Sequence, residues 1–479
     1  MRSLGLLAAA SALAGAAAAG AAEARKPNVV FILADDLGYT DLACQGSRFY
    51  RTPNVDRMAA EGLRFTDGYS CGPNCQPTRA ALMSGQYGPR TGVYTVGSIE
   101  RFAWRTRPLR PVDNVGKLPL DIRALGQALR DAGYVTGHFG KWHLGQDEAH
   151  HPLKRGFDEA IVSMGKHFDF DTIPEVDHPE GQYLADFLTD KAVDFIARHK
   201  DRPFYLQLHH YAVHAPHEAK PEMVARFVGT RPEGGHHDPT YAAMIASVDE
   251  SVGRVLKAID DMGLGDDTLV IFTSDNGGVG GYSREGIKVG KEITDNAPLR
   301  GGKGMLYEGG IRVPYIFRWT GKIPAGRTSD RPINSVDLYP TLLEVADGRS
   351  EGTLDGSSYL RILTSGGEWK PDRGPIYWHF PGYLGASKGQ WRATPAGAIR
   401  DGDWKLIEWF ETGKVELYHL RDDPGERNDL AADQPGRAVE LRAALVAWRE
   451  AINAPMPTPR APDPDAPARK AGKGGDDDE

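Results

Sequence analysis

The 479-residue sequence predicts an α/β protein with a mostly parallel central sheet flanked by helices and a smaller C-terminal α+β subdomain built on a short antiparallel sheet. Three observations support this fold class. Apolar, β-branched runs at 28–33 and 268–272 are typical of strands buried on both faces of a parallel sheet. Amphipathic segments separate such runs, as in α/β folds. From about Gly374 the pattern changes to short aromatic and β-branched strands with turn residues between them.

The remaining elements follow from periodicity and from residues that begin or end helices. Further strands are expected at 134–139, 204–208 and 313–319, and in the C-terminal part at 376–380, 398–407 and 415–420. Asn54 can cap a first helix, and Pro77 suits the first turn of a second. Glycines at 62, 85, 133 and 263 can end helices. The helices expected from these signals and from apolar stripes lie at 54–62, 77–85, 121–133, 183–199, 244–263, 337–346 and 436–452.

Composition divides the chain into four segments. Residues 1–24 contain Arg2, an uncharged apolar run and small residues suited to cleavage, which predicts a signal peptide. A membrane anchor is the alternative, but the run is mostly Ala and Gly and only weakly hydrophobic. Residues 25–370 form the predicted main α/β domain, 371–453 the C-terminal subdomain, and 454–479 a disordered tail rich in Pro, Lys, Gly and Asp. We therefore expect an exported protein, periplasmic or secreted, without stable membrane insertion.

Charge and cysteine content exclude some functions. A net charge of -8 gives no basic surplus for binding nucleic acid. The three cysteines are too few for a disulfide scaffold. Whether Cys44 and Cys71 pair or stay free is left open by the sequence.

Polar residues follow four of the predicted strands. They are Asp35 and Asp36, Lys141 and His143, His214, and Asp275 with Asn276. The carboxyl ends of parallel strands meet at one edge of a sheet, so these side chains are expected to converge, although the two adjacent acids could instead form a solvated turn or a helix cap. Carboxylate and amide oxygens suit a hard cation such as Ca²⁺ or Mg²⁺ better than zinc.

Cys75 is the predicted reactive centre. It lies just before Pro77, at the expected start of a helix, where free N–H groups and the helix dipole favour an anion. Arg79, one turn further on, adds a permanent positive charge. An anionic substrate group is the expected ligand. Without this context, a lone cysteine in a loop would more often be buried or disulfide-bonded.

Several motifs, in order, resemble those of the sulfatase family. The match begins with C-Q-P-T-R at 75–79, in which Asn74, Gln76 and Ser84 depart from the family's commonest residues while Cys75, Pro77 and Arg79 are intact. The similarity extends over residues 26–430. The other similar motifs are D-D-L-G at 35–38, G-K-W-H-L-G at 140–145, V-H-A-P at 213–216, S-D-N-G at 274–277 and G-G-K-G at 301–304. The chain is identified as a member of the formylglycine-dependent type I sulfatases, which are arylsulfatase-like and belong to the alkaline phosphatase superfamily.

The resemblance implies a mechanism. Asp35, Asp36, Asp275 and Asn276 would bind one calcium ion, with Cys75, oxidised to Cα-formylglycine by a formylglycine-generating enzyme, completing the shell. The hydrated aldehyde would attack sulfur and form a covalent sulfate ester. Lys141 and Lys303 would hold the sulfate. His214, or Lys303 beside it, would protonate the leaving alcohol. His143 would then take the proton from the second hydroxyl of the modified residue, which expels sulfate and regenerates the aldehyde.

The expected substrate is a sulfated small molecule or glycan. Two other functions stay possible at this stage: a phosphonate or phosphate ester hydrolase of the same superfamily, and a sulfated-glycan-binding protein that has lost catalysis. His209, His210 and His217 are expected to be loop or subsite residues and not catalysts. The aromatic residues Trp378, Phe380, Tyr383 and Trp391 are assigned to the core or the sheet surface by default, and the alternative is that some of them line a sugar subsite.

Overall fold

The central sheet has eight strands in the order β10-β2-β9-β8-β1-β7-β5-β6. The computed structural model describes residues 25–371, 373–386 and 389–460. The strands are β1 (Asn28–Ala34), β2 (Leu63–Phe65), β5 (Val135–Gly140), β6 (Glu159–Val162), β7 (Phe204–His209), β8 (Thr268–Ser274), β9 (Tyr315–Arg318) and β10 (Arg327–Ser329). Within this sheet only β9 pairs antiparallel with its neighbours, so the prediction of a mostly parallel sheet is confirmed.

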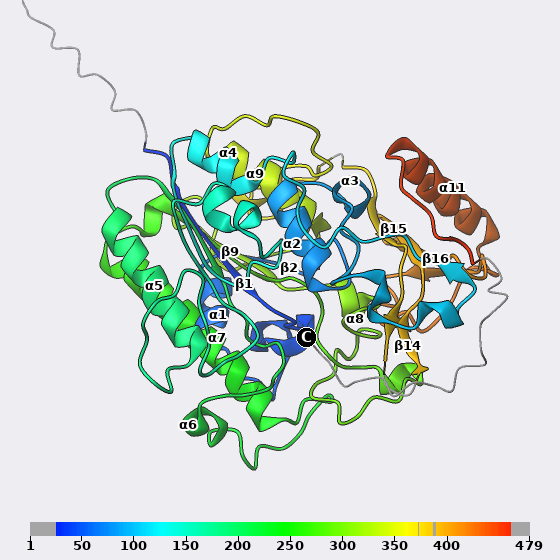
Figure 1. Ribbon diagram of the computed structural model, residues 1–479, viewed down its shortest axis with the longest axis horizontal. Coiled ribbons are helices and arrows are strands. Elements are labelled where there is room, and N and C mark those ends of the chain that lie inside the picture. The colour runs from blue at the N-terminus through cyan, green and yellow to red at the C-terminus, as the bar shows by residue number, and fades with distance from the viewer. Residues whose placement is uncertain (1–24, 372, 387–388, 461–479) are drawn as a thin grey trace, which may run out of the picture.

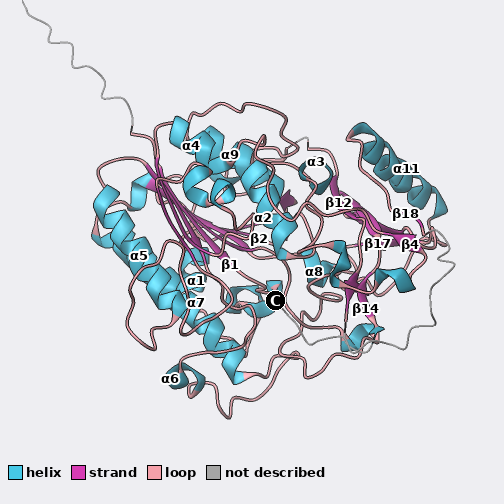
Figure 2. Ribbon diagram, in the orientation of Figure 1, coloured by secondary structure: helices cyan, strands magenta, loops and turns pink. Residues whose placement is uncertain are grey.

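Two layers of helices cover this sheet (Figures 1 and 2). Val30 and Ile32 of β1 pack in one hydrophobic core with α1 (Pro53–Ala60), α5 (Leu184–His199) and α7 (Pro239–Asp261). Val29, Phe31 and Leu33 pack in another with α2 (Cys75–Ser84), α4 (Leu125–Asp131) and α9 (Leu338–Val345). Because β1 is buried on both faces, it shows a continuous apolar run instead of an alternating pattern.

The strand register brings the predicted polar exits to one edge of the sheet. Leu33 of β1 pairs with both His209 of β7 and Thr273 of β8. Gly140 at the end of β5 also pairs with His209. The strands β5, β7, β1 and β8 therefore end side by side, and the loops that follow them leave from the same rim.

The C-terminal subdomain is a four-stranded antiparallel sheet with one long helix, as expected. Its strands are β12 (Ile376–Phe380), β15 (Ala396–Asp401), β16 (Trp404–Trp409) and β17 (Val415–His419), in that order. The helix α11 (Pro435–Ala451) packs Leu441 and Leu445 against this sheet. A small hairpin of β13 (Leu384–Gly385) and β14 (Trp391–Ala393) lies beside it, toward the main domain (Figure 1).

Five buried residues form an interdomain charge cluster between the two parts: Glu308, Arg312, Arg400, Lys405 and Glu426. Glu308 and Arg312 come from the short helix α8 (Glu308–Ile311) and its end, and the others from the C-terminal subdomain. Lys405 Nζ lies 2.9 Å from Glu308 Oε1 and 2.8 Å from Glu426 Oε1. The cluster thus ties the C-terminal sheet to the main domain by paired charges.

One expectation needs revision, and one open question is answered. The predicted tail is wrong for residues 454–460, because β18 (Thr458–Pro459) pairs antiparallel with β4 (Leu109–Arg110). The signal peptide at 1–24 and the tail from 461 onward lie outside the described residues.

Cys44 and Cys71 are both free, because they pack in different hydrophobic clusters. None of the helices described between residues 25 and 460 has the length and apolar character needed to cross a bilayer.

Candidate active site

Cys75 is the first residue of α2, whose ten residues are all buried. Asn74 precedes the helix in an extended conformation, Pro77 stands in its first turn, and Gly85 ends it with a left-handed φ of 67°. This local sequence explains the geometry, because proline is compatible with a first turn and glycine with a left-handed C-terminus. The Cys75 side chain therefore lies at a helix N-terminus, as predicted.

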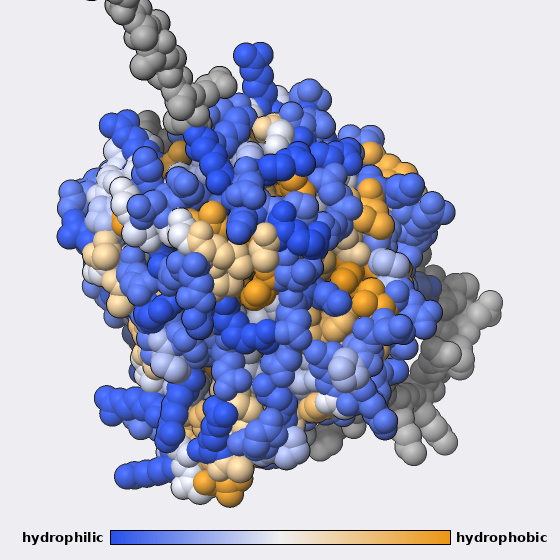
Figure 3. All heavy atoms as spheres, turned by 90° about the vertical axis from the view of Figure 1, so that its left-hand side faces the viewer, coloured by the Kyte–Doolittle hydropathy of each residue, from blue (hydrophilic) through white to orange (hydrophobic). Residues whose placement is uncertain are grey.

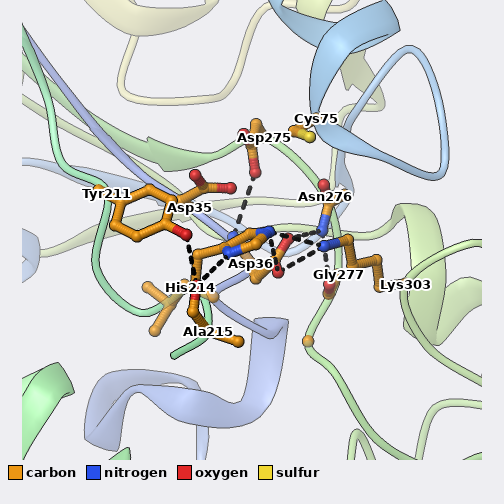
Figure 4. Close-up of polar contacts among 12 residues, drawn as sticks. Asp35, Asp36, Cys75, Tyr211, His214, Ala215, Asp275, Asn276, Gly277 and Lys303 are labelled. Atoms are coloured by element: carbon orange, nitrogen blue, oxygen red, sulfur yellow. Dashed lines mark hydrogen bonds and ion pairs between the residues drawn. The ribbon is translucent and has the colours of Figure 1, made fainter. Parts of the chain in front are cut away.

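The acids that follow β1 and β8 meet in front of Cys75 (Figure 4). The backbone N–H of Asp36 donates to Asp275 Oδ1 at 3.2 Å. Asn276 Nδ2 donates to Asp36 Oδ1 at 2.8 Å, which turns its amide oxygen away from Asp36. Ligand atoms of Asp35, Cys75 and Asp275 all lie within 4.8 Å of one another. The four oxygen-bearing residues predicted to converge do so.

Some of these buried oxygens have no hydrogen-bond partner among the described residues. They include Asp35 Oδ1 and Asn276 Oδ1. A buried polar atom without a partner is energetically costly, so such an atom is a candidate to bind an ion or a ligand. Carboxylate and amide oxygens of this kind are the donors that Ca²⁺ prefers. The residues present therefore fit a hard divalent cation.

Arg79 and Lys141 supply positive charge behind the acids. Arg79 Nε donates to Asp275 Oδ2 at 2.8 Å, and its Nη1 donates to the Lys141 carbonyl at 2.6 Å. Lys141 Nζ lies 2.5 Å from Asp35 Oδ2. Both side chains are 1% exposed, so these charges interact without much screening by water. Arg79 thus connects the residues that follow β5 to the acid that follows β8.

Lys303 and His214 form a second pair of groups around Asp36. Lys303 comes from the glycine-rich loop after β8, and its Nζ donates to Asp36 Oδ2 at 2.7 Å and to His214 Nε2 at 3.2 Å. His214 Nδ1 donates to the Ala215 carbonyl at 2.7 Å. A carbonyl can only accept, so Nδ1 carries the proton and Nε2 presents its lone pair to Lys303.

His143 approaches the cysteine from the β5 exit. Its Nδ1 lies 3.4 Å from Cys75 Sγ. Its backbone has a left-handed φ of 62°, which is uncommon outside glycine, and Gln76 Nε2 donates to its carbonyl at 3.1 Å. All six residues predicted to be catalytic are thus gathered around one point.

Burial and neighbouring charges shift the pKa values of the three acids in opposite directions. Burial, followed by the charge of the Asp35 carboxylate, raises the pKa of Asp275 to about 7. Burial also disfavours the charged form of Asp35, but Lys141 followed by His214 outweighs it, and the pKa of Asp35 lies well below its usual range. The pKa of Asp36 is lowered as well, because Lys303 and His214 outweigh the effect of burial. Acids this close repel one another, and an added cation would relieve that repulsion.

The histidines are held neutral. Burial, followed by the charge of Lys303, lowers the pKa of His214 to about 4. Burial and then Lys141 push the pKa of His143 well below its ordinary value. At Lys303 the effect of burial is outweighed by Asp36, and its pKa is raised. In the Lys303–His214 pair the proton is therefore on the lysine.

The site also contains residues that the sequence did not single out. Tyr211 packs its ring 5.4 Å from Lys141 Nζ, and its ring centre lies 5.0 Å from that of His214 in a tilted arrangement. Gln76 departs from the family's commonest residue, and its contact with the His143 carbonyl is not evident from the sequence. His209 is the buried last residue of β7 and packs against Phe31 and His138, so its expected place in a loop or subsite is wrong. Trp378 and Phe380 lie in a hydrophobic core, as expected.

Comparison with protein families gives two matches. Residues 27–348 match a family model described as Sulfatase. Residues 302–449 match one described as N-sulphoglucosamine sulphohydrolase, C-terminal. The two matches together cover both parts of the fold.

Curated relatives and solved structures agree with these matches. A sulfatase of Formosa agariphila is 33% identical, with 90% of each chain covered. Human N-acetylgalactosamine-6-sulfatase is 35% identical over 85% of this chain and 81% of the relative. The crystal structure of Ps i-CgsB in complex with k-i-k-neocarrahexaose has a TM-score of 0.75 and 30% identity, covering 88% of this chain and 93% of that one.

Proposed function

The chain belongs to the sulfatase family, and on that premise we propose that it hydrolyses sulfate monoesters of a carbohydrate by means of a formylglycine made from Cys75 and one bound calcium ion. Its enzyme class is that of the sulfuric ester hydrolases. The observation that carries the finer proposal is the meeting of Cys75 with three carboxylates and three cations at one edge of the sheet.

The calcium ion would be held by Asp35, Asp36, Asp275, Asn276 and the modified residue 75. Charge balance supports this assignment. The three carboxylates are already matched by Arg79, Lys141 and Lys303, so a divalent cation gives the site an excess of two positive charges. A sulfate ester carries one negative charge and released sulfate carries two, so this excess suits the charge that develops during hydrolysis.

Cys75 is a poor nucleophile as it stands. Burial raises the pKa of its thiol, despite the nearby charge of Lys141. The reactive form of a cysteine is the thiolate, so a raised pKa argues against direct attack by sulfur. When present, the calcium ion and the hydrated aldehyde supply the charge stabilisation and the nucleophilic hydroxyl that the thiol lacks.

Lys141 and Lys303 would bind the sulfate oxygens, with the helix N-terminus at residue 75 favouring the same anion. Both lysines remain charged because acids lie next to them. Arg79 would orient Asp275 and stabilise charge from behind. These groups are preorganised by burial and do not need to move when charge develops.

Proton transfer is assigned to two separate sides of the site. On one side Lys303 holds the proton that the leaving alcohol needs, and His214 accepts a hydrogen bond from it and keeps it in place. On the other side the neutral imidazole of His143, next to residue 75, can accept a proton. Of the two candidates for the group that protonates the leaving alcohol, His214 and Lys303, this arrangement favours Lys303.

A sugar substrate and export are further parts of the proposal. The name of one similar protein contains the sugar N-acetylgalactosamine, and the similar structure of Ps i-CgsB is a complex with k-i-k-neocarrahexaose. The first 24 residues have the composition of a signal peptide, which would place the enzyme in the periplasm or outside the cell. A formylglycine-generating enzyme would act on Cys75 during maturation.

The test is sulfate release from 4-nitrophenyl sulfate and from a panel of sulfated glycosaminoglycan and algal oligosaccharides. The protein should come from a host that converts the cysteine, with Cys75→Ala as the control. We expect release from the aryl sulfate and from at least one oligosaccharide. Faster turnover of 4-nitrophenyl phenylphosphonate than of the aryl sulfate would instead favour the phosphonate hydrolase, and tight binding without release would favour a glycan-binding protein.

A further inference from the structure

We propose that Asn296 is a positioning residue for the reaction, which holds the loop of Lys303 so that Lys303 Nζ reaches the leaving oxygen of the substrate. This role rests on the proposed function, because it concerns the proton that Lys303 gives to that oxygen. Asn296 acts through backbone groups of the neighbouring loops and not by contact with the substrate.

Asn296 is a polar residue in the interior of the protein. The face shown in Figure 3 is mainly hydrophilic, as expected from the preference of polar residues for water. The Asn296 side chain, by contrast, is 0% exposed. A buried amide needs hydrogen-bond partners, because an unpaired one is energetically costly. The partners of Asn296 therefore show which parts of the chain it connects.

The Asn296 side chain joins two loops through their backbones. Its Nδ2 donates to the carbonyls of Gly278 at 3.0 Å, Gly280 at 3.2 Å and Gly301 at 3.1 Å. The amide has two hydrogens for these three carbonyls, so one hydrogen is shared. Its Oδ1 accepts from the Gly278 N–H at 3.2 Å. Gly278 and Gly280 follow β8, and Gly301 stands two residues before Lys303. One amide thus links the loop after the metal-site acid of β8 to the loop of the proposed acid.

Lys303 shares one of these acceptors with Asn296. The backbone N–H of Lys303 donates to the Gly278 carbonyl at 3.0 Å, and the same oxygen accepts from Asn296 Nδ2. A carbonyl oxygen has two lone pairs and can accept both bonds. The residues on either side of Lys303 are glycines, whose backbone is free to adopt many conformations. The bonds of Asn296 therefore restrict a loop that its own sequence leaves flexible.

Three glycines pack directly against the Asn296 amide. A Cβ added to Gly38 would lie 2.6 Å from Asn296 Oδ1, and one added to Gly278 would lie 2.7 Å from the same oxygen. A Cβ on Gly302 would lie 2.8 Å from Asn296 Nδ2. Real Cβ atoms do not approach so closely, so these positions require glycine. The loops that follow β1 and β8 and the loop of Lys303 thus surround one side chain, and asparagine has the size and the two kinds of polar atom that this space accepts.

The chemistry of the proposed step explains why the position of Lys303 matters. As the bond between sulfur and the leaving oxygen breaks, its electron pair stays on that oxygen, while an oxygen of the modified residue 75 bonds to sulfur. Lys303 Nζ gives a proton to the leaving oxygen and later regains one from water. Such a transfer needs hydrogen-bond distance, so a displaced lysine is a poor acid. The loss is largest for a leaving group that depends on the proton.

The experiment compares kcat/KM for phenyl sulfate and 4-nitrophenyl sulfate, using mature enzyme with saturating calcium and rates corrected for the converted fraction of residue 75. Phenolate is the poorer leaving group and needs the proton more than 4-nitrophenolate does. Asn296→Ala should slow phenyl sulfate by about 100-fold and 4-nitrophenyl sulfate by less than about tenfold. Partial unfolding would lower both rates by the same factor, because it changes only the number of active molecules. The ratio of the two rates therefore separates positioning from stability.

Three further variants keep the result specific. Asn28→Ala is the matched control, because Asn28 is also 0% exposed and its Nδ2 donates to Thr268 Oγ1 at 3.1 Å, at the opposite ends of β1 and β8 from the site. It should leave the ratio unchanged. Asn296→Ser retains a shorter polar group and should shift the ratio in the same direction as Asn296→Ala, but less. In a Lys303→Met chain, which has already lost the acid, adding Asn296→Ala should change the ratio by less than about twofold.

Two results would overturn the proposal. One is an equal slowing of both substrates by Asn296→Ala and by Asn296→Ser, which would show a purely structural residue. The other is the same change of ratio in the Lys303→Met chain as in the unsubstituted chain, which would show that Asn296 does not act through Lys303. Failure of the proposed function would appear separately, as absence of sulfate release by the unsubstituted mature enzyme.

Discussion

The active site and the interdomain charge cluster are both groups of buried acids and bases, but their oxygens are satisfied differently. In the interdomain cluster, Lys405 lies between the carboxylates of Glu308 and Glu426, and Arg312 pairs with Glu308 at 2.8 Å. In the active site, Asp35 Oδ1 and Asn276 Oδ1 find no hydrogen-bond partner among residues 25–460 as far as the structure describes them, and Asp35 lies beside Cys75. In the interdomain cluster the acids are already paired with cations, whereas the active site has oxygens that suit an ion and a substrate.

This difference separates a structural role from a catalytic one. Both clusters are largely buried and contain an acid whose pKa is raised to about 7, so burial and a shifted pKa do not identify function by themselves. What distinguishes the active site is unpaired oxygens beside a potential nucleophile, at the end of four strands. Substitutions in the two clusters should therefore affect different measurements.

The largest effect on stability is expected in the interdomain cluster. Lys405→Met would leave Glu308 and Glu426 buried together without their shared cation. We expect the free energy of unfolding to fall by about 3–5 kcal/mol, as for other broken buried pairs. Chemical denaturation measures this change. Calcium affinity of the folded variant should stay that of the unsubstituted chain, and a matched loss of calcium affinity would show that the two clusters are not independent.

The largest effect on chemistry is expected at Asp275. Asp275→Asn removes a charged oxygen ligand while keeping the shape, so calcium affinity and sulfate release should both fall by at least about 100-fold. Calorimetry with calcium and a sulfate-release assay check the two quantities. Undiminished calcium affinity in Asp275→Asn would contradict the metal assignment, whatever happened to turnover.

Calcium binding should depend on pH through Asp275. Its pKa of about 7 means that the metal-free site takes up a proton as the pH falls below about 7, and a carboxylate must lose that proton to bind metal. The apparent calcium affinity should be constant above pH 7 and fall by about tenfold per pH unit below it. Titrations at pH 8, 7 and 6 test this, and Lys405→Met should show the same profile. A profile that is flat down to pH 6 is the contrary result.

The smallest effect is expected at Glu426. Burial, followed by Glu308, raises its pKa to about 7, so the folded state binds its proton more tightly than the unfolded state. The stability from this group is present at low pH and is lost as the pH rises through 5–7. The pKa of Glu308 is lowered to about 2, so its contribution is constant in that window. Glu426→Gln should flatten the slope of unfolding free energy between pH 5 and 7, measured with saturating calcium. An unchanged slope would indicate that Glu426 stays ionised.

Much of the site could be predicted because it follows strand ends. The apolar run of β1 stops at Asp35 and Asp36, and that of β8 stops just before Asp275, so parallel pairing alone brings these acids together. Pro77 and Gly85 likewise marked the helix that begins at Cys75. These features depend on local sequence and on one rule of topology.

The remaining features depend on tertiary contacts that no local pattern encodes. Lys405 stands among apolar residues in β16 and looks like an ordinary strand residue, yet it is buried between two carboxylates. Thr458 and Pro459 have the composition of a disordered tail, but they find a partner strand in residues 109–110. The pairing of Lys303 with His214, which decides the proton's location, joins two loops far apart in sequence.

The central claim is that turnover depends on converting Cys75 to formylglycine. The most direct test prepares the protein with graded amounts of a formylglycine-generating enzyme, determines the converted fraction of residue 75 by mass spectrometry, and measures sulfate release from 4-nitrophenyl sulfate with saturating calcium. We predict that the rate rises in proportion to the converted fraction and vanishes with the unconverted chain. Equal rates from converted and unconverted protein would contradict the account.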